Sequence, residues 1–159
     1  MSLLEMVAGL EEAGIRYIVV GGVAGVAHGS RRVTDDLDIL YHDSPANLER
    51  LAALLASWHA YPRGIEPGLP FIMDAQTLRG VTLLTLVTDR GLLDLLREVK
   101  GVGSYARALG RSERVALDGG AILVLSLRQL IAAKRAAVRP KDREALIELE
   151  ALLELRGEV

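Results

Sequence analysis

The chain has 159 residues, half of them hydrophobic, which is enough for one domain with its own core, and it has no cysteine for disulfides or thiolate metal sites. Its net charge is −2, from 19 basic and 21 acidic residues, and 4% of its residues are aromatic. This composition argues against a protein that coats nucleic acid through its overall charge or stacks bases on aromatic side chains, and it leaves room for a local basic patch.

The first sixty residues are predicted to alternate helices and strands. Ser2 and Glu5 form a capping-box pattern before apolar residues at helical spacing, and Ser44-Pro45 is a typical helix start. We expect helices that end near Gly14, Gly29 and Trp58, and strands over residues 16–20 and 37–41. Gly21-Gly22 separates the first strand from the second, short helix over residues 23–28.

The stretch from Tyr61 to Gly80 has no regular pattern, because three prolines and three glycines interrupt it. A long irregular segment in a compact domain is often a lid or a binding loop. The alternative is a surface excursion around a short edge strand near Phe71-Ile72-Met73.

The second half of the chain is predicted to hold two hairpins followed by two helices. We expect strands over residues 81–87, 92–96, 114–117 and 121–125, and helices over about 126–137 and 140–155. Because the strands are adjacent or joined by hairpins, the pattern favours an α+β fold with a mixed sheet flanked by helices over a doubly wound parallel sheet. We expect residues 1–159 to form a single domain, with a core over about 15–125 and C-terminal helices over about 126–156.

Asp36-Leu37-Asp38 is the first pattern that indicates chemistry. Residues two apart on a strand point to the same face, so the two carboxylates project together. Their mutual repulsion calls for a positive partner, and hard oxygen ligands suit Mg²⁺ or Mn²⁺. The structural alternative is an acidic pair on a solvent-facing strand.

A third carboxylate, Asp94, has two leucines on each side in the strand over residues 92–96. Three carboxylates on neighbouring strands can hold two metal ions roughly 3.5–4 Å apart. One ion would lower the pKa of an acceptor hydroxyl and the other would bind a triphosphate, with Asp94 nearest the acceptor and placed to take its proton. The alternative is that Asp94 caps the next turn or pairs with a nearby arginine.

The glycine pair Gly21-Gly22 offers bare backbone N–H groups before a helix, which suit phosphate. Valine stands at positions 23 and 26, where a dinucleotide fingerprint needs glycine, and Gly29-Ser30 lacks the lysine of a P-loop. Both of those nucleotide-binding folds are therefore disfavoured.

Two cations are candidates for the phosphates of a nucleotide. Arg32 precedes the acidic strand, and arginine suits bidentate phosphate contacts; the alternative is a solvated loop arginine. Lys134 falls on the apolar stripe of its helix, where it either reaches a phosphate or extends along the apolar surface to water. Lys141 and Asp142 are placed to pair with Lys134 or to shape the pocket.

In their joint order, these motifs resemble the signature of the polymerase-β-like nucleotidyltransferase superfamily, and in particular its small prokaryotic members of the minimal and toxin types. The matching segments are Gly21-Gly22, His28-Gly29, Arg32-Val33-Thr34, Asp36-Leu37-Asp38, 88–96, 126–134 and 139–142. The resemblance implies a mixed-sheet nucleotidyltransferase core, Asp36, Asp38 and Asp94 as metal ligands, and Gly21 and Gly22 at the nucleotide phosphates. Many active members of the superfamily have serine where this chain has Gly22.

The predicted activity is therefore a metal-dependent transfer of a nucleoside monophosphate from an NTP to an acceptor hydroxyl, with release of pyrophosphate. Small molecules, proteins and RNA ends are all compatible acceptors. The alternative function is a catalytically inactive binding or regulatory module of the toxin–antitoxin type. No apolar run approaches the roughly 20 residues of a membrane span, so we expect a cytoplasmic protein without a membrane partner.

Overall fold

The computed structural model of the protein describes residues 3–117, 120–137 and 139–157. Within them, seven strands form one sheet in the order β3-β4-β5-β2-β1-β9-β8, and two short strands, β6 and β7, form a separate hairpin. The sheet strands are β1 Tyr17–Val20, β2 Asp36–Tyr41, β3 Tyr61–Pro62, β4 Leu83–Thr88, β5 Gly91–Leu96, β8 Glu113–Leu117 and β9 Gly120–Val124; the hairpin strands are β6 Glu98–Val99 and β7 Gly103–Ser104.

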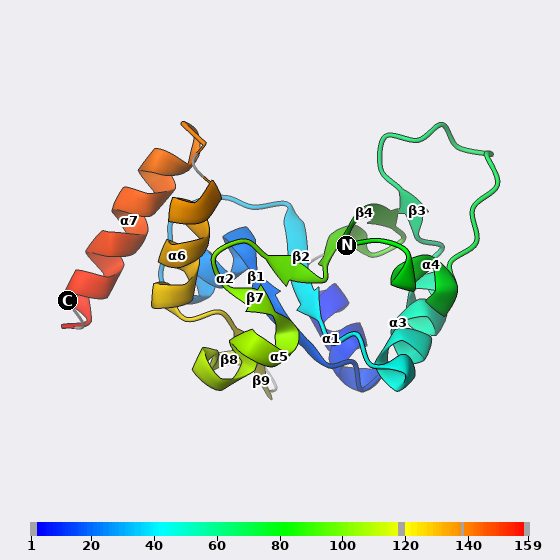
Figure 1. Ribbon diagram of the computed structural model, residues 1–159, viewed down its shortest axis with the longest axis horizontal. Helices are drawn as coiled ribbons and strands as arrows, with labels where there is room; N and C mark the ends of the chain where they lie inside the picture. The colour runs from blue at the N-terminus through cyan, green and yellow to red at the C-terminus, as the bar shows by residue number, and fades with distance from the viewer. Residues whose placement is uncertain (1–2, 118–119, 138, 158–159) are drawn as a thin grey trace.

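Helices flank this sheet and end the chain (Figure 1). They are α1 Leu3–Glu12, α2 Gly21–Ala27, α3 Pro45–Ser57, α4 Ala75–Arg79, α5 Tyr105–Ala108, the 3-10 helix η1 Leu109–Arg111, α6 Leu127–Ala137 and α7 Asp142–Leu155. None of the helices in these ranges combines the length and the apolar character that crossing a bilayer requires.

The sheet is mixed, as the sequence predicts. β2 runs antiparallel to β1 and parallel to β5, and β1 runs parallel to β9. The other neighbours, β3 with β4, β4 with β5 and β8 with β9, are antiparallel. The α+β fold class with C-terminal helices is therefore confirmed.

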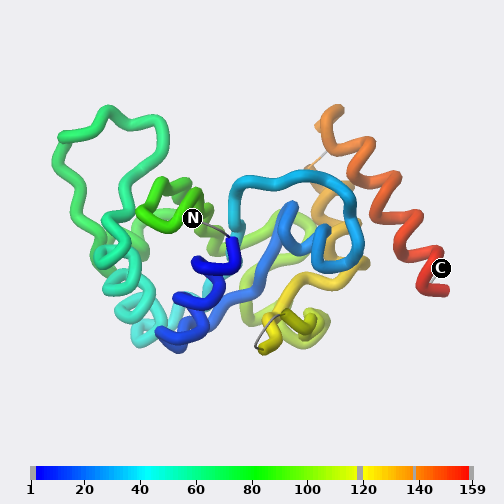
Figure 2. The backbone as a smooth tube through the Cα atoms, turned by 180° about the vertical axis from the view of Figure 1, so that it is seen from behind, coloured from blue at the N-terminus to red at the C-terminus, as the bar shows by residue number. Residues whose placement is uncertain are grey.

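The hydrophobic core lies against one face of the central strands. Leu37 and Ile39 of β2 and Leu93 and Leu95 of β5 are fully buried on that face. α1 contacts both β2 and α3 there, and it lies on the side of the sheet that Figure 2 shows. The opposite face carries the alternate residues of the same strands, and on that side α2 contacts β2 and α6 contacts α2.

The prediction for residues 61–80 is wrong in two details. The edge strand is β3 at Tyr61–Pro62, which pairs with β4, and it is not near Phe71-Ile72-Met73. The later part of the stretch contains α4, whose N-cap Asp74 accepts a hydrogen bond from the backbone N–H of Thr77 at 2.8 Å. Between β3 and α4 the chain extends away from the body of the molecule (Figure 2).

The short second helix also begins earlier than predicted. Gly21 and Gly22 form the first turn of α2 and do not precede it. The two terminal helices were predicted at nearly their observed positions, although α7 begins at Asp142, two residues after Pro140. The turn predicted over residues 118–120 lies partly outside the described residues, while β8 and β9 on either side pair as expected.

Candidate active site

Asp36, Asp38 and Asp94 meet on the face of the sheet opposite the core. Parallel pairing of β2 with β5 places Asp94 directly beside Asp38, and Asp36 lies two residues earlier on β2. Each residue offers a carboxylate oxygen, and these oxygens lie within 4.8 Å of one another. Leu37 and Leu93 are fully buried on the other face and therefore fix the strand parity that brings the three acids together.

Arg63, which the sequence did not single out, reaches into this cluster from the segment after β3. Its Nη2 lies 2.9 Å from Oδ1 of Asp94, and its Nη1 lies 3.5 Å from Oδ2 of Asp36. The backbone N–H of Arg63 donates to the carbonyl of Thr85 at 2.9 Å, and Nη2 also donates to the carbonyl of Leu86 at 3.0 Å. Asp94 therefore belongs to the acid cluster and also pairs with an arginine, so the two sequence-based alternatives for this residue coexist.

The pKa of Asp38 is far above the usual value of a carboxyl group. Burial, followed by the neighbouring charges and hydrogen bonding of Asp94 and the charge of Asp36, raises the pKa of Asp38 to about 7, and Arg63 opposes this rise only in part. One guanidinium group thus does not neutralise three carboxylates.

These residues fit a divalent metal ion. Oδ1 of Asp38 is buried and accepts no hydrogen bond from the described residues. A buried carboxylate oxygen without a partner is costly, and a cation that binds between the three acids would satisfy it. The donor set consists only of carboxylate oxygens, which is the chemistry that Mg²⁺ and Mn²⁺ prefer.

Gly21 is next to the acid cluster and has a backbone φ of +65°, which disfavours residues with a Cβ atom. A Cβ atom at this position would overlap Oδ2 of Asp38. Glycine is therefore needed here both for the backbone conformation and for the close approach of the carboxylate.

Gly22 has a different constraint. A Cβ atom there would lie 2.9 Å from Oγ1 and 3.1 Å from Cβ of Thr34. A serine at position 22, as in many members of the superfamily, would require Thr34 to move.

A cavity of about 360 Å³ lies beside the acid cluster and is called here the α2–α6 cavity. All four residues predicted to contact the nucleotide line it: Gly21, Gly22, Arg32 and Lys134. Arg139 and Lys141 add two more cations to its wall. The structure therefore brings together, from α2, the loop before β2 and α6, the residues that the sequence proposed for phosphate binding.

Acidic residues of α7 hold these cations in place. Asp142 is 5% exposed and contacts Nζ of Lys134 at 3.1 Å and Nε of Arg139 at 2.7 Å. Hydrogen bonding from Arg139 keeps the pKa of Asp142 below its usual value, despite partial desolvation. The guanidinium group of Arg32 lies 3.6 Å from Glu144 and 3.7 Å from Glu148. The predicted pairing of Asp142 with Lys134 is present, and Lys134 is not simply solvated.

His28, which belongs to the resemblance, does not join the acid cluster. Its Nε2 lies 2.7 Å from the carbonyl oxygen of Leu125, and its Nδ1 lies 3.4 Å from Nη1 of Arg156. This histidine ties the end of α2 to the segment between β9 and α6.

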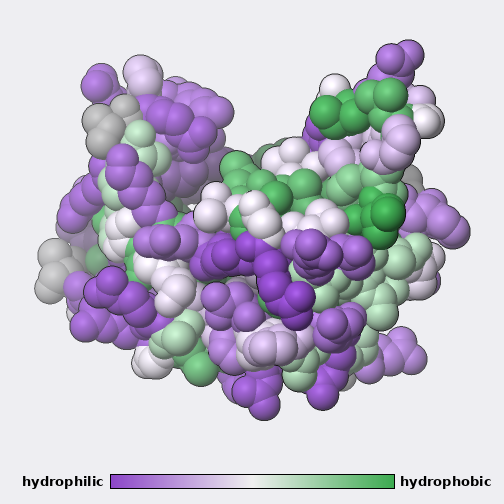
Figure 3. All heavy atoms as spheres, turned by 45° about the vertical axis from the view of Figure 1, so that its right-hand side comes forward, coloured by the Kyte–Doolittle hydropathy of each residue, from purple (hydrophilic) through white to green (hydrophobic). Residues whose placement is uncertain are grey.

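One side of the molecule is hollowed. In the space-filling view, two raised parts of the molecule stand on either side of a depression (Figure 3). In the ribbon view, the start of β2 lies between the segment after β3 and the turn between α6 and α7 (Figure 1). The end of β2 that carries Asp36 is thus placed where a substrate can approach.

A protein family described as "Nucleotidyl transferase of unknown function (DUF2204)" matches residues 1–158. The chain belongs to this family. The predicted nucleotidyltransferase is thereby confirmed at the level of the family. None of the curated proteins matches this chain by sequence.

Solved nucleotidyltransferases share its fold. The solution structure of the antibiotic-resistance factor ANT(2'')-Ia is 15% identical, with a TM-score of 0.62 over 98% of this chain and 82% of that chain. The crystal structure of ANT(2'')-Ia with adenylyl-2''-tobramycin is 17% identical, with a TM-score of 0.59 over 98% and 87% of the two chains. A putative nucleotidyltransferase from Thermotoga maritima, TM1012, is 14% identical, with a TM-score of 0.58 over 93% and 94%.

Proposed function

We propose that this nucleotidyltransferase moves a nucleoside monophosphate from an NTP to an acceptor hydroxyl and releases pyrophosphate. The observation that supports it most strongly is the convergence of Asp36, Asp38 and Asp94 beside a cavity lined by glycines and cations. Bound divalent ions would supply charge stabilisation for the triphosphate and activation of the acceptor. ANT(2'')-Ia, whose crystal structure is a complex with adenylyl-2''-tobramycin, has the same fold.

The residues of the chain take separate roles in this proposal. Gly21 and Gly22 offer backbone N–H groups to the phosphates, and Arg32 and Lys134 offer charge-assisted hydrogen bonds. The acceptor oxygen attacks the α-phosphorus, the bond to the pyrophosphate oxygen breaks, and Asp94 takes the proton of the hydroxyl. We propose that residues 1–159 act as one domain in this reaction, because α6 and α7 form part of the cavity.

The direct test is NTP binding with Mg²⁺ or Mn²⁺, measured by calorimetry for each NTP. We expect at least one NTP to bind in a metal-dependent way, and the Asp36→Asn/Asp38→Asn double variant to abolish that binding. Asp35→Asn is a matched control, because Asp35 is exposed and next to the pair in sequence. If no NTP binds with either metal, or if the double variant binds as the control does, the proposal fails. The alternative function, an inactive binding or regulatory module of the toxin–antitoxin type, would then remain. The cytoplasmic location stays a prediction from the sequence.

Metal binding is expected to weaken as the pH falls below 7. Asp38 titrates at about 7 instead of 3.8, so at pH 6 a metal ion must displace a proton from it. The apparent affinity for Mn²⁺ should fall by up to about tenfold per pH unit in this range. Folding of the metal-free protein keeps a proton on Asp38 that the unfolded chain releases near pH 3.8. The free energy of unfolding should therefore decrease as the pH rises from 3.8 towards 7. Calorimetry at pH 6 and pH 8 checks the first expectation, and an Mn²⁺ affinity that is equal at the two values contradicts it.

Arg63 is expected to compete with the metal. Arg63→Met removes the ion pairs to Asp36 and Asp94, so the metal-free protein should unfold at a lower temperature because the carboxylates then repel each other without relief. The same variant should bind Mn²⁺ about 3- to 10-fold more tightly, because no cation has to leave. Thermal unfolding with and without Mn²⁺ measures both effects, with the exposed Arg50→Met as control. Weaker Mn²⁺ binding by Arg63→Met would mean that Arg63 supports the bound state and does not compete with it.

A further inference from the structure

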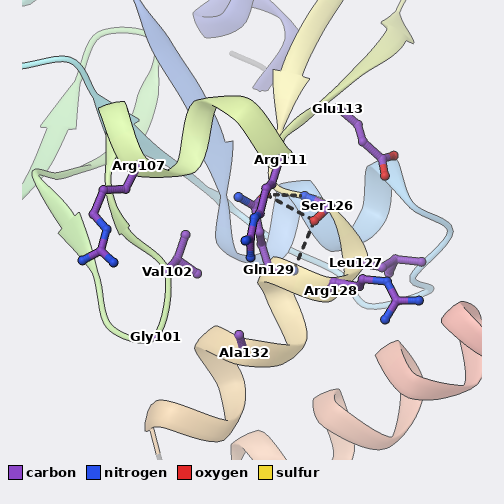
Figure 4. Close-up of a pocket in the computed structure, with 10 residues that line it drawn as sticks. All are labelled: Gly101, Val102, Arg107, Arg111, Glu113, Ser126, Leu127, Arg128, Gln129 and Ala132. Atoms are coloured by element: carbon purple, nitrogen blue, oxygen red, sulfur yellow. Dashed lines mark hydrogen bonds between the residues drawn. The ribbon is translucent and has the colours of Figure 1, made fainter. Parts of the chain in front are cut away.

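A second cavity, of about 850 Å³, lies on a different face of α6 and is called here the arginine cavity (Figure 4). Leu130 and Lys134 of α6 line the α2–α6 cavity, whereas Arg128 and Ala132 line this one. Its other walls come from the β6–β7 turn, from α5 and η1, and from the start of β8. The arginine cavity shares no lining residue with the α2–α6 cavity, so it is a separate candidate site.

The wall of the arginine cavity is fixed by buried hydrogen bonds. Gln129 is 7% exposed; its Oε1 accepts from the backbone N–H of Ser126 at 2.9 Å, and its Nε2 donates to the carbonyl of Ala108 at 2.9 Å. These bonds tie the start of α6 to α5. On the other side, a Cβ atom at Gly101 would lie 2.6 Å from the carbonyl oxygen of Ala132, so the β6–β7 turn packs directly on the helix.

The cavity concentrates positive charge in a chain whose net charge is −2. Arg107, Arg111 and Arg128 line it together with one acid, Glu113. Glu113 lies 3.6 Å from the guanidinium group of Arg156, so its charge is shared with a further cation. Among the described residues, no ion pair involves Arg107 or Arg111, whereas Arg32, Arg63 and Arg139 each face a carboxylate.

The arginines lie along the cavity and do not converge on one point. In the close-up, Arg107 and Arg128 are at opposite sides, with Arg111 between them (Figure 4). Leu127 and Arg128 are also the first residues of α6, so the positive end of the helix dipole faces the same region. Guanidinium groups spaced in this way fit several separate phosphates better than one.

We infer that the arginine cavity binds an extended chain of phosphates, either the backbone of a short oligonucleotide or an inorganic polyphosphate. Its volume is within the usual range for small-ligand sites. The charged groups contact phosphate oxygens, and none of the described residues that line the cavity is an aromatic residue that could stack on a base, so binding is independent of base sequence. This site is separate from the proposed NTP site and does not depend on it.

The test measures the binding of a fluorescently labelled eight-nucleotide single strand at several salt concentrations, with inorganic polyphosphate as a competitor. The Arg107→Gln/Arg111→Gln variant should bind at least about tenfold more weakly at 50 mM salt. The slope of log affinity against log salt concentration should become shallower by about 1.4, for two lost phosphate contacts. Arg16→Gln/Arg50→Gln is the control; it removes the same charge from exposed positions outside both cavities and should keep most of the affinity and the native slope.

The two sources of phosphate are distinguished by which probe displaces the other at lower concentration. The Arg107→Gln/Arg111→Gln variant should also keep the native unfolding temperature and the native NTP affinity, because both side chains are exposed and lie outside the α2–α6 cavity. If neither probe binds the native protein, or if both double variants lose affinity equally, the inference is overturned. Arg111→Gln alone serves as a second variant. We expect its slope of log affinity against log salt concentration to change by about half as much as that of the double variant.

Discussion

Asp94→Asn is expected to reduce nucleotidyl transfer by at least about 100-fold while NTP binding stays within about threefold of the native value. Asp94 is beside Asp38 in the acid cluster, and in the proposed reaction it lies nearest the acceptor hydroxyl, whereas Asp36 and Asp38 remain to hold the metal ion that binds the triphosphate. Asparagine keeps the size of the side chain, loses the charge that a metal ion requires and cannot take a proton from the acceptor. The rate is measured as pyrophosphate release from NTP with a cell lysate as the source of acceptor.

Asp89→Asn is the matched control for this prediction. Asp89 lies in the turn that leads into β5, on the same hairpin, and its carboxylate pairs with His59 away from the acid cluster. The control should retain the native rate. A native rate in Asp94→Asn would show that the third carboxylate takes no part in the reaction.

Gly21→Ala is expected to damage both stability and metal binding. The backbone φ of +65° costs a residue with a Cβ atom about 1–2 kcal/mol, and the new methyl group overlaps the carboxylate of Asp38. The carboxylate must therefore leave its present position, which takes one ligand out of the cluster. We expect a loss of about 2–4 kcal/mol in the free energy of unfolding and a loss of Mn²⁺ binding of more than about tenfold.

Gly14→Ala separates the two causes. Gly14 has nearly the same φ, +70°, but no atom lies within 4 Å of the place its Cβ would take. The free energy of unfolding of Gly14→Ala should therefore fall only by the cost of the backbone conformation, about 1–2 kcal/mol, and the variant should bind Mn²⁺ as the native protein does. Chemical denaturation and calorimetry measure the two variants side by side. Equal Mn²⁺ affinities in Gly21→Ala and Gly14→Ala would contradict the role given to the close approach of Gly21 and Asp38.

The acid cluster was predictable from the sequence because strand geometry is local. Asp36 and Asp38 must share a face of β2, and buried leucines on both sides of Asp94 place it inside the sheet. What the pattern did not contain is the pairing of β2 with β5, which sets Asp94 beside Asp38. The resemblance to a family implied only that Asp94 joins the acidic pair, and it gave neither the pairing of these strands nor their register.

Arg63 was missed because its position depends on the path of an irregular segment. No periodicity predicts where the chain after β3 turns, and the pairing of Tyr61 with Val87 is what directs Arg63 towards the acids. The sequence contained one indirect signal, since clustered carboxylates require a nearby cation. The alternative that Asp94 pairs with a nearby arginine followed from this requirement, but it did not identify Arg63.

The arginine cavity could not be predicted from the sequence either. Its lining residues come from two separate segments, 101–113 and 126–132, which become neighbours when α6 packs against the β6–β7 turn. The predicted elements did not include that hairpin or α5. The four residues proposed for phosphate binding, by contrast, were found one at a time from glycine and cation chemistry, and tertiary packing places all of them around one cavity.

The most direct test of the central claim is a titration with Mn²⁺ followed by electron paramagnetic resonance, in the presence of an NTP analogue whose α–β bond cannot be cleaved. We expect the native protein to bind two Mn²⁺ ions per chain with the analogue, and Asp38→Asn to bind none at the same concentrations, because Asp38 lies beside Asp94 on the neighbouring strand and its buried Oδ1 accepts no hydrogen bond from the described residues. Mn²⁺ binding of equal strength and number in the native protein and in Asp38→Asn would contradict the claim that the three carboxylates form the metal site.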